Sequence, residues 1–362
     1  MGTAAATPGP ASLSSEILFE RDGEIQALDL GSGRTRPLTH DLPDRAGMDL
    51  GDPWALSPDG QWLALAHNPE GQAALLALVP PAGGPAQEVG RFEGRIDVLC
   101  WSHDATRLLF LLNRRHERTG ELLEQSLRLY DTVSRGQAVL YQRTFRAEEA
   151  SRHGLWPWAW VPGNAAIYVV YALDRTNDPG TLHVLDVRGG EPRPVTTDFL
   201  PVGGQAVWAE SSQLLLRPRL AERGLSPLYL ARASLDGSLS EIRRLTPGDW
   251  FVGAVAWSPD GRQVVVERHE AQAHGTFVVH LWSVALDGTA RQLTSAPAYR
   301  EEHPVWAPDG RTIVFERWRA TRPEPAGLWA LDLDQAEPRR IEEVGLHPQA
   351  ACCTAGAPGR SP

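Results

Sequence analysis

The sequence Trp257-Ser258-Pro259-Asp260-Gly261, followed by the run Gln263–Glu267 (QVVVE), recurs as Trp306-Ala307-Pro308-Asp309-Gly310 and Thr312–Glu316 (TIVFE). Pro presets the first turn position, Asp bonds its own backbone and Gly accepts a positive φ, so each copy predicts a tight turn. The flanking runs are short and rich in β-branched residues, which is typical of strands.

This motif is the first of two elements that recur in each repeat unit. A good copy begins at Leu56 and weaker copies begin at Trp101, Trp160 and Trp208, at intervals of about 45 to 60 residues. The second recurring element is a hairpin about twenty-five to thirty residues further on in each unit. Its copies lie at 24–39, 181–196, 228–246 and 281–294, with degenerate copies at 74–92, 127–141 and 328–341. Each unit therefore predicts four short strands, and a unit of this size is that of a propeller blade.

The hairpin has seven copies and the Trp motif has six, which bears on how the ring closes. Residues 16–20 (EILFE) resemble a second strand, but no first strand precedes them. Residues 346–350 (LHPQA) resemble 302–306 (EHPVW), the start of a first strand. We therefore predict an all-β, seven-bladed propeller of four-stranded antiparallel blades, closed by a C-terminal strand that joins the N-terminal blade. Six blades, with the N-terminal strands placed elsewhere, is the alternative.

These residues resemble the WD40-like PD40 repeat of TolB, which also occurs in the propellers of prolyl-oligopeptidase-type proteases. The resemblance extends from about residue 16 through nearly the whole chain, and the copies at Trp257 and Trp306 match best. It implies a β-propeller, a role in protein interaction and a place in the cell envelope. The fold itself is compatible with many activities.

Composition narrows the classes of partner. The net charge is −10, and no cationic cluster of the kind that binds phosphate is evident, so we expect no nucleic-acid partner. All basic residues other than histidine are arginine, which excludes lysine-based covalent catalysis. Cys100, Cys352 and Cys353 match neither a disulfide framework nor a zinc spacing. No apolar run has the length of a transmembrane helix, and we expect a monomer.

We expect residues 1–15 to form a flexible tether, 16–353 a single propeller domain and 354–362 a disordered tail. The first residues (MGTAAATPGPASLSS) lack the basic start and apolar core of a signal peptide. The TolB resemblance nevertheless favours an extracytoplasmic location, periplasm or cell envelope, with a leader absent from this chain. A cytoplasmic location is the alternative.

The candidate binding residues precede or begin the first strand of each blade, because the loops there surround one mouth of the central channel. Several are acidic, and converging carboxylates attract cations. The candidates are Asp49, Asp52, Asp97, His153, Trp156, Gln205, Asp249, Trp250, Glu301, His303 and His347. The Trp156 side chain is expected either to be exposed at the mouth as a binding platform or, as the alternative, to pack within the inner strands. In two blades the connection that follows the second strand, at 113–125 and at 318–327, is predicted to be a long recognition loop.

The favoured function is a non-enzymatic binding module that presents its loops and channel mouth to a protein or peptide. No catalytic residue is assigned, and the G-x-S-x-G nucleophile elbow of a serine hydrolase is absent. The alternative is a metal-dependent, carbohydrate-active enzyme similar to oligogalacturonate lyase. In that case His303, His347 and Gln349 would hold a divalent metal. No cofactor is expected for the binding module, apart from Ca²⁺ or another divalent cation held at the mouth.

Overall fold

The computed structural model describes residues 16–39, 53–145, 154–172, 180–195, 197–202, 207–208, 211–219, 225–271, 277–320, 324–335, 337–343 and 345–349. The expected tether at 1–15, the expected tail at 354–362 and the cysteines at 352 and 353 lie outside these residues. Cys100 is buried with a free thiol. The described residues include no helix with the length and apolarity that a bilayer crossing requires.

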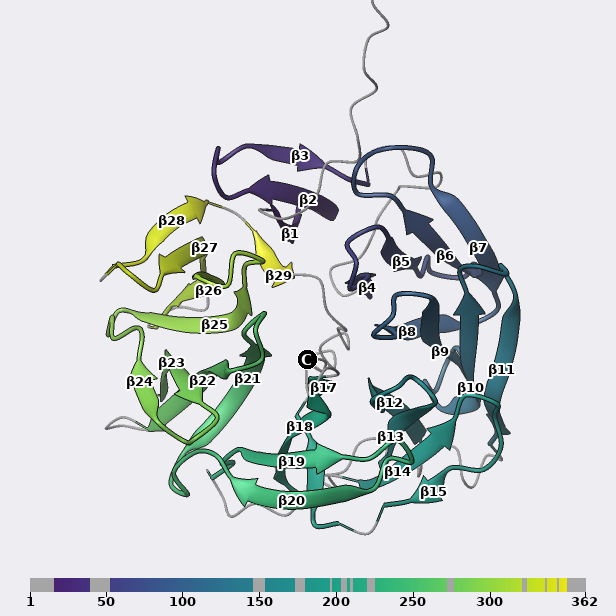
Figure 1. Ribbon diagram of the computed structural model, residues 1–362. Helices are drawn as coiled ribbons and strands as arrows, with labels where there is room; N and C mark the ends of the chain where they lie inside the picture. Colours follow the sequence, from purple (N-terminus) through teal and green to yellow (C-terminus); the bar gives the residue numbers. More distant parts are fainter. Residues whose placement is uncertain are drawn as a thin grey trace, which may run out of the picture.

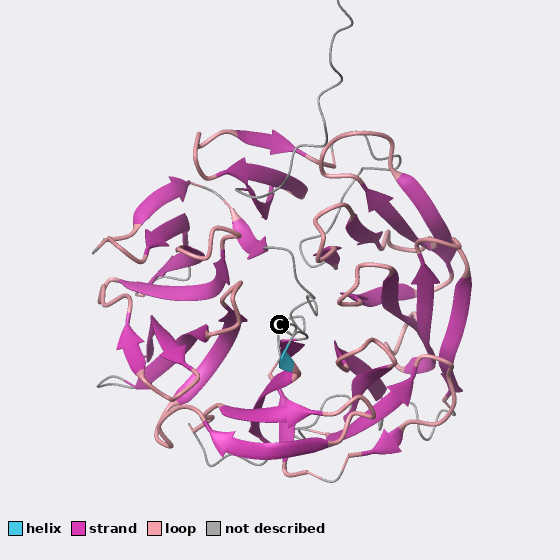
Figure 2. Ribbon diagram, in the orientation of Figure 1, coloured by secondary structure: helices cyan, strands magenta, loops and turns pink. Residues whose placement is uncertain are grey.

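The described residues form seven antiparallel sheets arranged as blades around a ring, so the chain is a seven-bladed β-propeller (Figures 1 and 2). Within each blade the first strand lies toward the centre and the last lies outside. Blade 1 is ordered β29-β1-β2-β3, which confirms both the predicted number of blades and the predicted closure by the C-terminal strand.

The blades have the following strands. Blade 1 contains β1 (Glu16–Arg21), β2 (Glu24–Asp29), β3 (Thr35–Pro37) and β29 (Leu346–Gln349). Blade 2 contains β4 (Trp54–Leu56), β5 (Leu63–His67), β6 (Ala74–Val79) and β7 (Gln87–Phe92). Blade 3 contains β8 (Arg95–Trp101), β9 (Arg107–Arg115), β10 (Leu122–Asp131) and β11 (Gln137–Thr144). Blade 4 contains β12 (Gly154–Trp160), β13 (Ala166–Ala172), β14 (Thr181–Asp186) and β15 (Arg193–Pro194).

Blade 5 differs from the four-stranded pattern, because β16 (Phe199–Pro201) and β17 (Val207–Trp208) both pair with β18 (Gln213–Pro218). Its outer strands are β19 (Tyr229–Ala233) and β20 (Leu239–Arg244). Blade 6 contains β21 (Phe251–Trp257), β22 (Gln263–Ala271), β23 (Phe277–Ala285) and β24 (Ala290–Gln292). Blade 7 contains β25 (Tyr299–Trp306), β26 (Thr312–Arg319), β27 (Pro325–Asp332) and β28 (Arg339–Glu342).

The turn after the first strand has a positive φ at one equivalent position in six blades, even where the sequence motif is degenerate. In the Ser-Pro-Asp-Gly copy of blade 6, Ser258 Oγ donates to Asp260 Oδ1, which also accepts the backbone N–H of Arg262. The fourth residue after each Leu or Trp has a positive φ whatever its type. These residues are Gly60 (69°), Ala105 (57°), Asn164 (57°), Ser212 (55°), Gly261 (65°) and Gly310 (66°). The aspartates are therefore turn formers, as predicted.

Three of the Trp residues that end first strands link neighbouring blades. Trp101 Nε1 donates to Ala55 O of blade 2 at 3.0 Å, and Trp160 Nε1 donates to Cys100 O of blade 3 at 3.3 Å. Trp306 Nε1 makes the equivalent bond to Ala256 O of blade 6 at 3.2 Å. All three side chains are buried. For Trp101, Trp160 and Trp306 the interpretation as wedges between blades is therefore confirmed.

One predicted loop is largely sheet. Strands β9 and β10 remain paired as far as Arg115 and Leu122, so the connection is 116–121 rather than 113–125. Leu122, at the end of the extended pairing, is buried against Phe145. Asn113 and Gln125, which the sequence placed in the loop, are buried and hydrogen-bonded to each other.

Candidate functional site

Two of the histidines that were predicted at the channel mouth have an unusual backbone conformation. His303 (β25) and His347 (β29) have φ values of 54° and 52°. Both lie where the strand register shifts, between Glu302 and Val305 in blade 7 and opposite the shift between Leu18 and Glu20 in blade 1. Positive φ costs a non-glycine residue free energy, and such strain concentrates at functional sites. The two imidazoles are close together, with ring centroids 5.6 Å apart.

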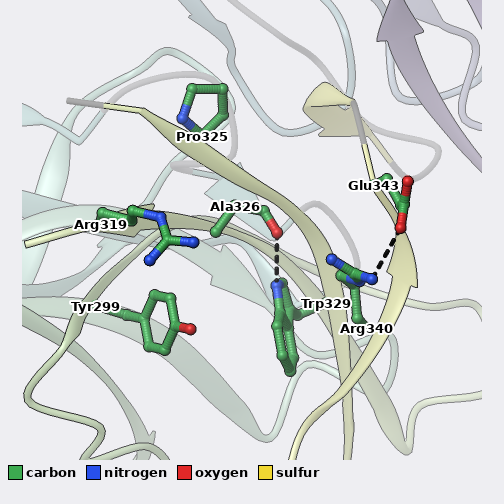
Figure 3. A pocket seen from close by; sticks show the side chains of 7 residues that line it. All are labelled: Tyr299, Arg319, Pro325, Ala326, Trp329, Arg340 and Glu343. Atoms are coloured by element: carbon green, nitrogen blue, oxygen red, sulfur yellow. Dashed lines mark hydrogen bonds and ion pairs between the residues drawn. The ribbon is translucent and has the colours of Figure 1, made fainter. Parts of the chain in front are cut away.

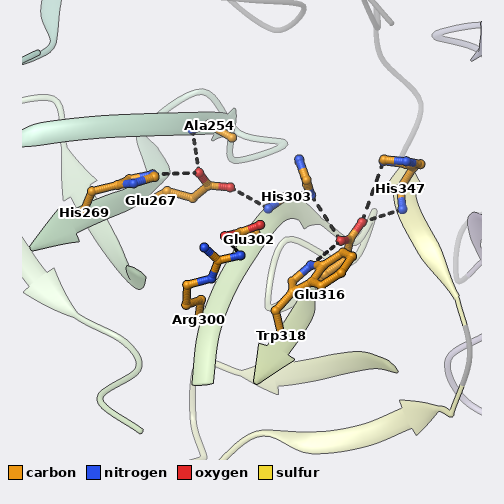
Figure 4. Close-up of polar contacts among 9 residues, drawn as sticks. All are labelled: Ala254, Glu267, His269, Arg300, Glu302, His303, Glu316, Trp318 and His347. Carbon is orange, nitrogen blue, oxygen red and sulfur yellow. Dashed lines mark hydrogen bonds and ion pairs between the residues drawn. The ribbon is translucent and has the colours of Figure 1, made fainter. Parts of the chain in front are cut away.

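A buried carboxylate lies between the two imidazoles. Glu316 (β26) is 1% exposed and accepts the backbone N–H of His347 at 2.6 Å and Trp318 Nε1 at 2.8 Å. Its oxygens lie 3.2 Å from His303 Nδ1 and 3.8 Å from His347 Nδ1 (Figure 4). One ligand atom from each of His303, Glu316 and His347 falls within 4.8 Å of the others. The group joins blade 7 to the strand that closes the ring.

Glu316 has a counterpart one blade earlier. Glu267 (β22) is buried and accepts the backbone N–H of His303 at 2.6 Å, so in each case a glutamate of one blade binds the first strand of the next. Glu267 also accepts the N–H of Ala254 and lies 3.4 Å from His269 Nε2 (Figure 4). These bonds satisfy both carboxylates and join blades 6, 7 and 1.

Amides have the corresponding role elsewhere in the ring. Asn68 bonds both backbone groups of Ile96, which joins blade 2 to blade 3. Gln125 Oε1 accepts the N–H of Leu155, which joins blade 3 to blade 4. Because neutral amides suffice for a structural link, charge at Glu267 and Glu316 is not needed for that purpose alone.

The pKa values of the site follow from the close approach of its histidines and buried glutamates. Burial disfavours the charged form of His303, but Glu316, assisted by Glu267 and Glu302, raises its pKa to about 9. Burial works against ionisation of Glu316, yet His303 holds the pKa of Glu316 below its usual value. Burial lowers the pKa of His347, and the positive charge of His303 adds to that effect. Burial raises the pKa of Glu302, whose nearest cation is Arg300 at 3.2 Å.

The donor set suits a divalent transition metal better than calcium. Two imidazole nitrogens and one carboxylate oxygen are ligands that Zn²⁺ and Mn²⁺ accept, whereas Ca²⁺ prefers oxygen alone. His303 Nδ1 is buried and makes no hydrogen bond of ordinary geometry, although Glu316 is near. A three-residue set would leave coordination positions open for a ligand.

Several predicted mouth residues have structural contacts. Asp97 (β8) accepts Asn113 Nδ2 at 2.5 Å and pairs with Arg95. Trp156 (β12) is half-buried and packs against the core of blades 3 and 4, which corresponds to the packing alternative. Gln349 Nε2 donates to Trp54 O at 3.4 Å, so this side chain links the closing strand to blade 2.

Two other predicted residues lie inside the fold. Trp250 is 5% exposed and packs against Trp282 and the Arg268 guanidinium. Glu301 is fully buried, where it pairs with Arg317 and His280. Asp249 is an exposed turn residue, and Asp49, Asp52, His153 and Gln205 lie outside the described residues. Of the predicted set, the structure thus brings His303 and His347 together.

Glu316, which completes the group, was not selected from the sequence, although a signal was present. The second-strand runs ILFE, VVVE and IVFE end in Glu20, Glu267 and Glu316. Burying a charged residue at the end of an otherwise apolar strand costs free energy unless the charge is paired or hydrogen-bonded. The recurrence of glutamate at this position in three consecutive blades around the ring therefore indicates an environment that stabilises a buried carboxylate.

No protein-family model matches the sequence, and no curated protein sequence matches it either. Solved structures match its shape. The β-propeller domain of the Trilobed protease from Pyrococcus furiosus is 16% identical with a TM-score of 0.59, over 91% of this chain and 93% of that one. An oligogalacturonate lyase in complex with manganese is 18% identical with a TM-score of 0.59, over 86% and 82%. TolB from Acinetobacter baumannii is 16% identical with a TM-score of 0.50, over 82% and 68%.

The chain spans about half the length of two further matches, an acylaminoacyl peptidase and a prolyl endopeptidase. At these identities the likeness shows the fold alone. The chain is a seven-bladed propeller similar to TolB, to peptidase propellers and to oligogalacturonate lyase. The propeller domain of the Trilobed protease has an open velcro topology. In this chain, by contrast, β29 pairs with β1 and closes the ring.

Proposed function

We propose that this protein is a binding propeller whose channel mouth holds a divalent transition-metal ion and uses it to bind a protein or peptide partner. The observation that carries the proposal is the convergence of His303, Glu316 and His347 within 4.8 Å across the junction of blades 7 and 1. Both imidazole side chains are about two-fifths exposed, so the group faces solvent on one side. A partner would supply an oxygen or nitrogen donor to the open coordination positions.

Metal binding is tested by titrating the purified, EDTA-treated protein with Zn²⁺, Mn²⁺ and Ca²⁺ in a calorimeter. The expected result is one Zn²⁺ or Mn²⁺ per chain, with Ca²⁺ binding at least tenfold more weakly. His303→Asn and His347→Asn should each weaken binding more than tenfold, and asparagine tolerates the positive φ at both positions. His116→Asn, on the tip of the β9–β10 hairpin, is the control for adventitious binding by histidine. Equal losses in all three variants would contradict the site.

Partner binding is tested with a random peptide library displayed against the immobilised, Zn²⁺-loaded protein. Binders should be lost when EDTA is added and should not bind His347→Asn. Peptides that bind regardless of metal and of this substitution would assign partner binding to another surface.

A second candidate function is a metal-dependent enzyme that acts on an acidic carbohydrate. The same three side chains support it, together with the similarity of fold to an oligogalacturonate lyase in complex with manganese. Incubation of the Mn²⁺-loaded protein with oligogalacturonate, followed by ultraviolet detection of unsaturated product, tests this alternative. Turnover that disappears in His303→Asn would replace the binding role with the catalytic one.

A further inference from the structure

Blade 7 carries a pocket that shares no residue with the metal-binding group. All four strands contribute to its lining, through Tyr299 on β25, Arg319 on β26, Trp329 on β27 and Arg340 on β28 (Figure 3). Pro325, Ala326 and Glu343 complete it. Its volume is about 310 Å³, near the lower end for small-molecule sites.

The aromatic part of the pocket lies on the face of blade 7 that is directed toward blade 6. Trp329 packs against a cluster that includes Ala256 and Leu281 of blade 6. The neighbouring residue Leu328 points the other way, against Phe19 of blade 1, as expected for alternating side chains of a strand. The aromatic lining therefore belongs to the side of blade 7 that is directed toward blade 6.

The two aromatic rings are fixed in place. Trp329 and Tyr299 have centroids 6.2 Å apart, and Trp329 Nε1 donates to Ala326 O at 3.1 Å. Behind them the Arg317 guanidinium lies 4.2 Å from the Trp329 ring and 5.0 Å from the Tyr299 ring. Arg317 is itself held by the buried Glu301 carboxylate. A ligand would meet a preformed aromatic surface, which lowers the entropy cost of binding.

The rim of the pocket is positively charged. Arg319 and Arg340 are both exposed, and among the described residues Arg319 makes no ion pair. Arg340 pairs with Glu343 at 2.9 Å, but both partners are more than half exposed, so the pair is weak and open to competition. A guanidinium binds a carboxylate or phosphate through two parallel hydrogen bonds, which makes such an anion the suitable competitor.

We propose that this pocket binds a small anion that carries one flat ring, with the ring against Trp329 and Tyr299 and the acidic group toward Arg319 and Arg340. The pocket volume accommodates one ring with its substituent. The proposal is independent of the metal-binding function, because the two sets of residues do not overlap.

The test is calorimetric titration of the EDTA-treated protein with benzoate and with phenyl phosphate, which distinguish a carboxylate from a phosphate ligand. Either one should bind with a Kd of about 1 mM or below, and at least tenfold more tightly than benzamide, which lacks the charge, or acetate, which lacks the ring. Arg319→Gln and Arg340→Gln should each weaken binding at least fivefold. Arg339→Gln is the matched control, because Arg339 neighbours Arg340 on β28 but contacts Leu30 of blade 1.

Binding of benzamide or acetate as tight as that of benzoate would overturn the proposal, as would an equal loss in Arg339→Gln. Failure of both ring anions to bind would also overturn it. Circular dichroism of each variant establishes that a loss of affinity is not a loss of fold.

Discussion

The backbone N–H of His347 donates to Glu316 at 2.6 Å, which ties the strand that closes the ring to the blade before it. Glu316 is almost completely buried, whereas His347 is about two-fifths exposed. The Glu316 carboxylate thus accepts a structural hydrogen bond and is also a candidate metal ligand. Because of this overlap, binding of a cation and closure of the propeller are expected to be thermodynamically linked.

The first prediction is that metal stabilises the whole protein. A cation that binds the folded state alone stabilises it by about 2.7 kcal/mol at one hundred times its Kd. Differential scanning fluorimetry should therefore show a higher Tm with Zn²⁺ or Mn²⁺ than with EDTA. The shift should vanish in Glu316→Gln and His347→Asn and persist in His116→Asn. An unchanged wild-type Tm at saturating metal would refute the prediction.

The second prediction concerns pH in the metal-free protein. His303 has a folded pKa of about 9, above its ordinary 6.5, so its contribution to stability is complete below about pH 6.5 and is lost as pH rises through 9. Glu316 has a lowered folded pKa, so its contribution is present above its ordinary 4.5 and is lost as pH falls through the folded value. The ion pair therefore stabilises most between about pH 4.5 and 6.5.

Urea denaturation of wild type and His303→Asn in EDTA, at pH 5.5, 7.5 and 9.5, measures this contribution. The difference in free energy of unfolding should be largest at pH 5.5 and smallest at pH 9.5. The neighbouring groups Glu267, Glu302, Glu316 and His347 are present in both proteins, so the comparison isolates the charge of His303. A difference that does not vary with pH would exclude the ion pair as its source.

Short-range signals predicted most of the fold. The Trp-to-Gly turns and the hairpins followed from backbone preferences of Pro, Asp and Gly, and the unequal number of copies led to closure by residues 346–350. Three hairpins also end in a Leu-Thr pair, at 38–39, 245–246 and 293–294, and its cause is local. Thr39, Thr246 and Thr294 accept the backbone N–H groups of Ile25, Leu228 and Leu281.

The site was less accessible to sequence analysis. Position near the start of a first strand selected Glu301 and His303 alike, and residues two apart share a face in a regular strand. The register shift between Glu302 and Val305 and the positive φ of His303 break that regularity, and Glu301 turns inward to Arg317. Glu316 is separated from His347 along the chain and meets it only because the ring closes. Such a contact depends on packing between blades, which residue patterns within one repeat do not specify.

The third prediction concerns the turn backbone. Ala105 has a φ of 57°, a conformation that costs a non-glycine residue about 1 to 2 kcal/mol. Ala105→Gly should stabilise the protein by roughly 0.5 to 1 kcal/mol after the larger chain entropy of glycine is deducted. In the reciprocal variant Gly310→Ala, a Cβ would have no atom within 4 Å, so a similar destabilisation would come from φ alone. Urea denaturation measures both, and shifts of the same sign would contradict the shared turn.

The fourth prediction is that metal slows opening of the ring. Strand β29 has four residues, and its pairing with β1 has only two aligned positions, Leu18 with Gln349 and Glu20 with Leu346. Separation of β29 from blade 7 would remove His347 from the metal-binding group. At one hundred times the Kd, amides of residues 345–349 that exchange through this opening should therefore exchange about one hundredfold more slowly.

Hydrogen exchange followed by mass spectrometry tests this link with peptides that cover 16–21 and 345–349. Peptides from β8 and β9 are the internal control, since blade 3 contributes nothing to the metal-binding group. His347→Asn should abolish the protection at β29 without changing exchange in blade 3. Stoichiometric metal binding without slower exchange at 345–349 would mean that the cation does not hold the closing strand, because a ligand on that strand must be released whenever the strand leaves.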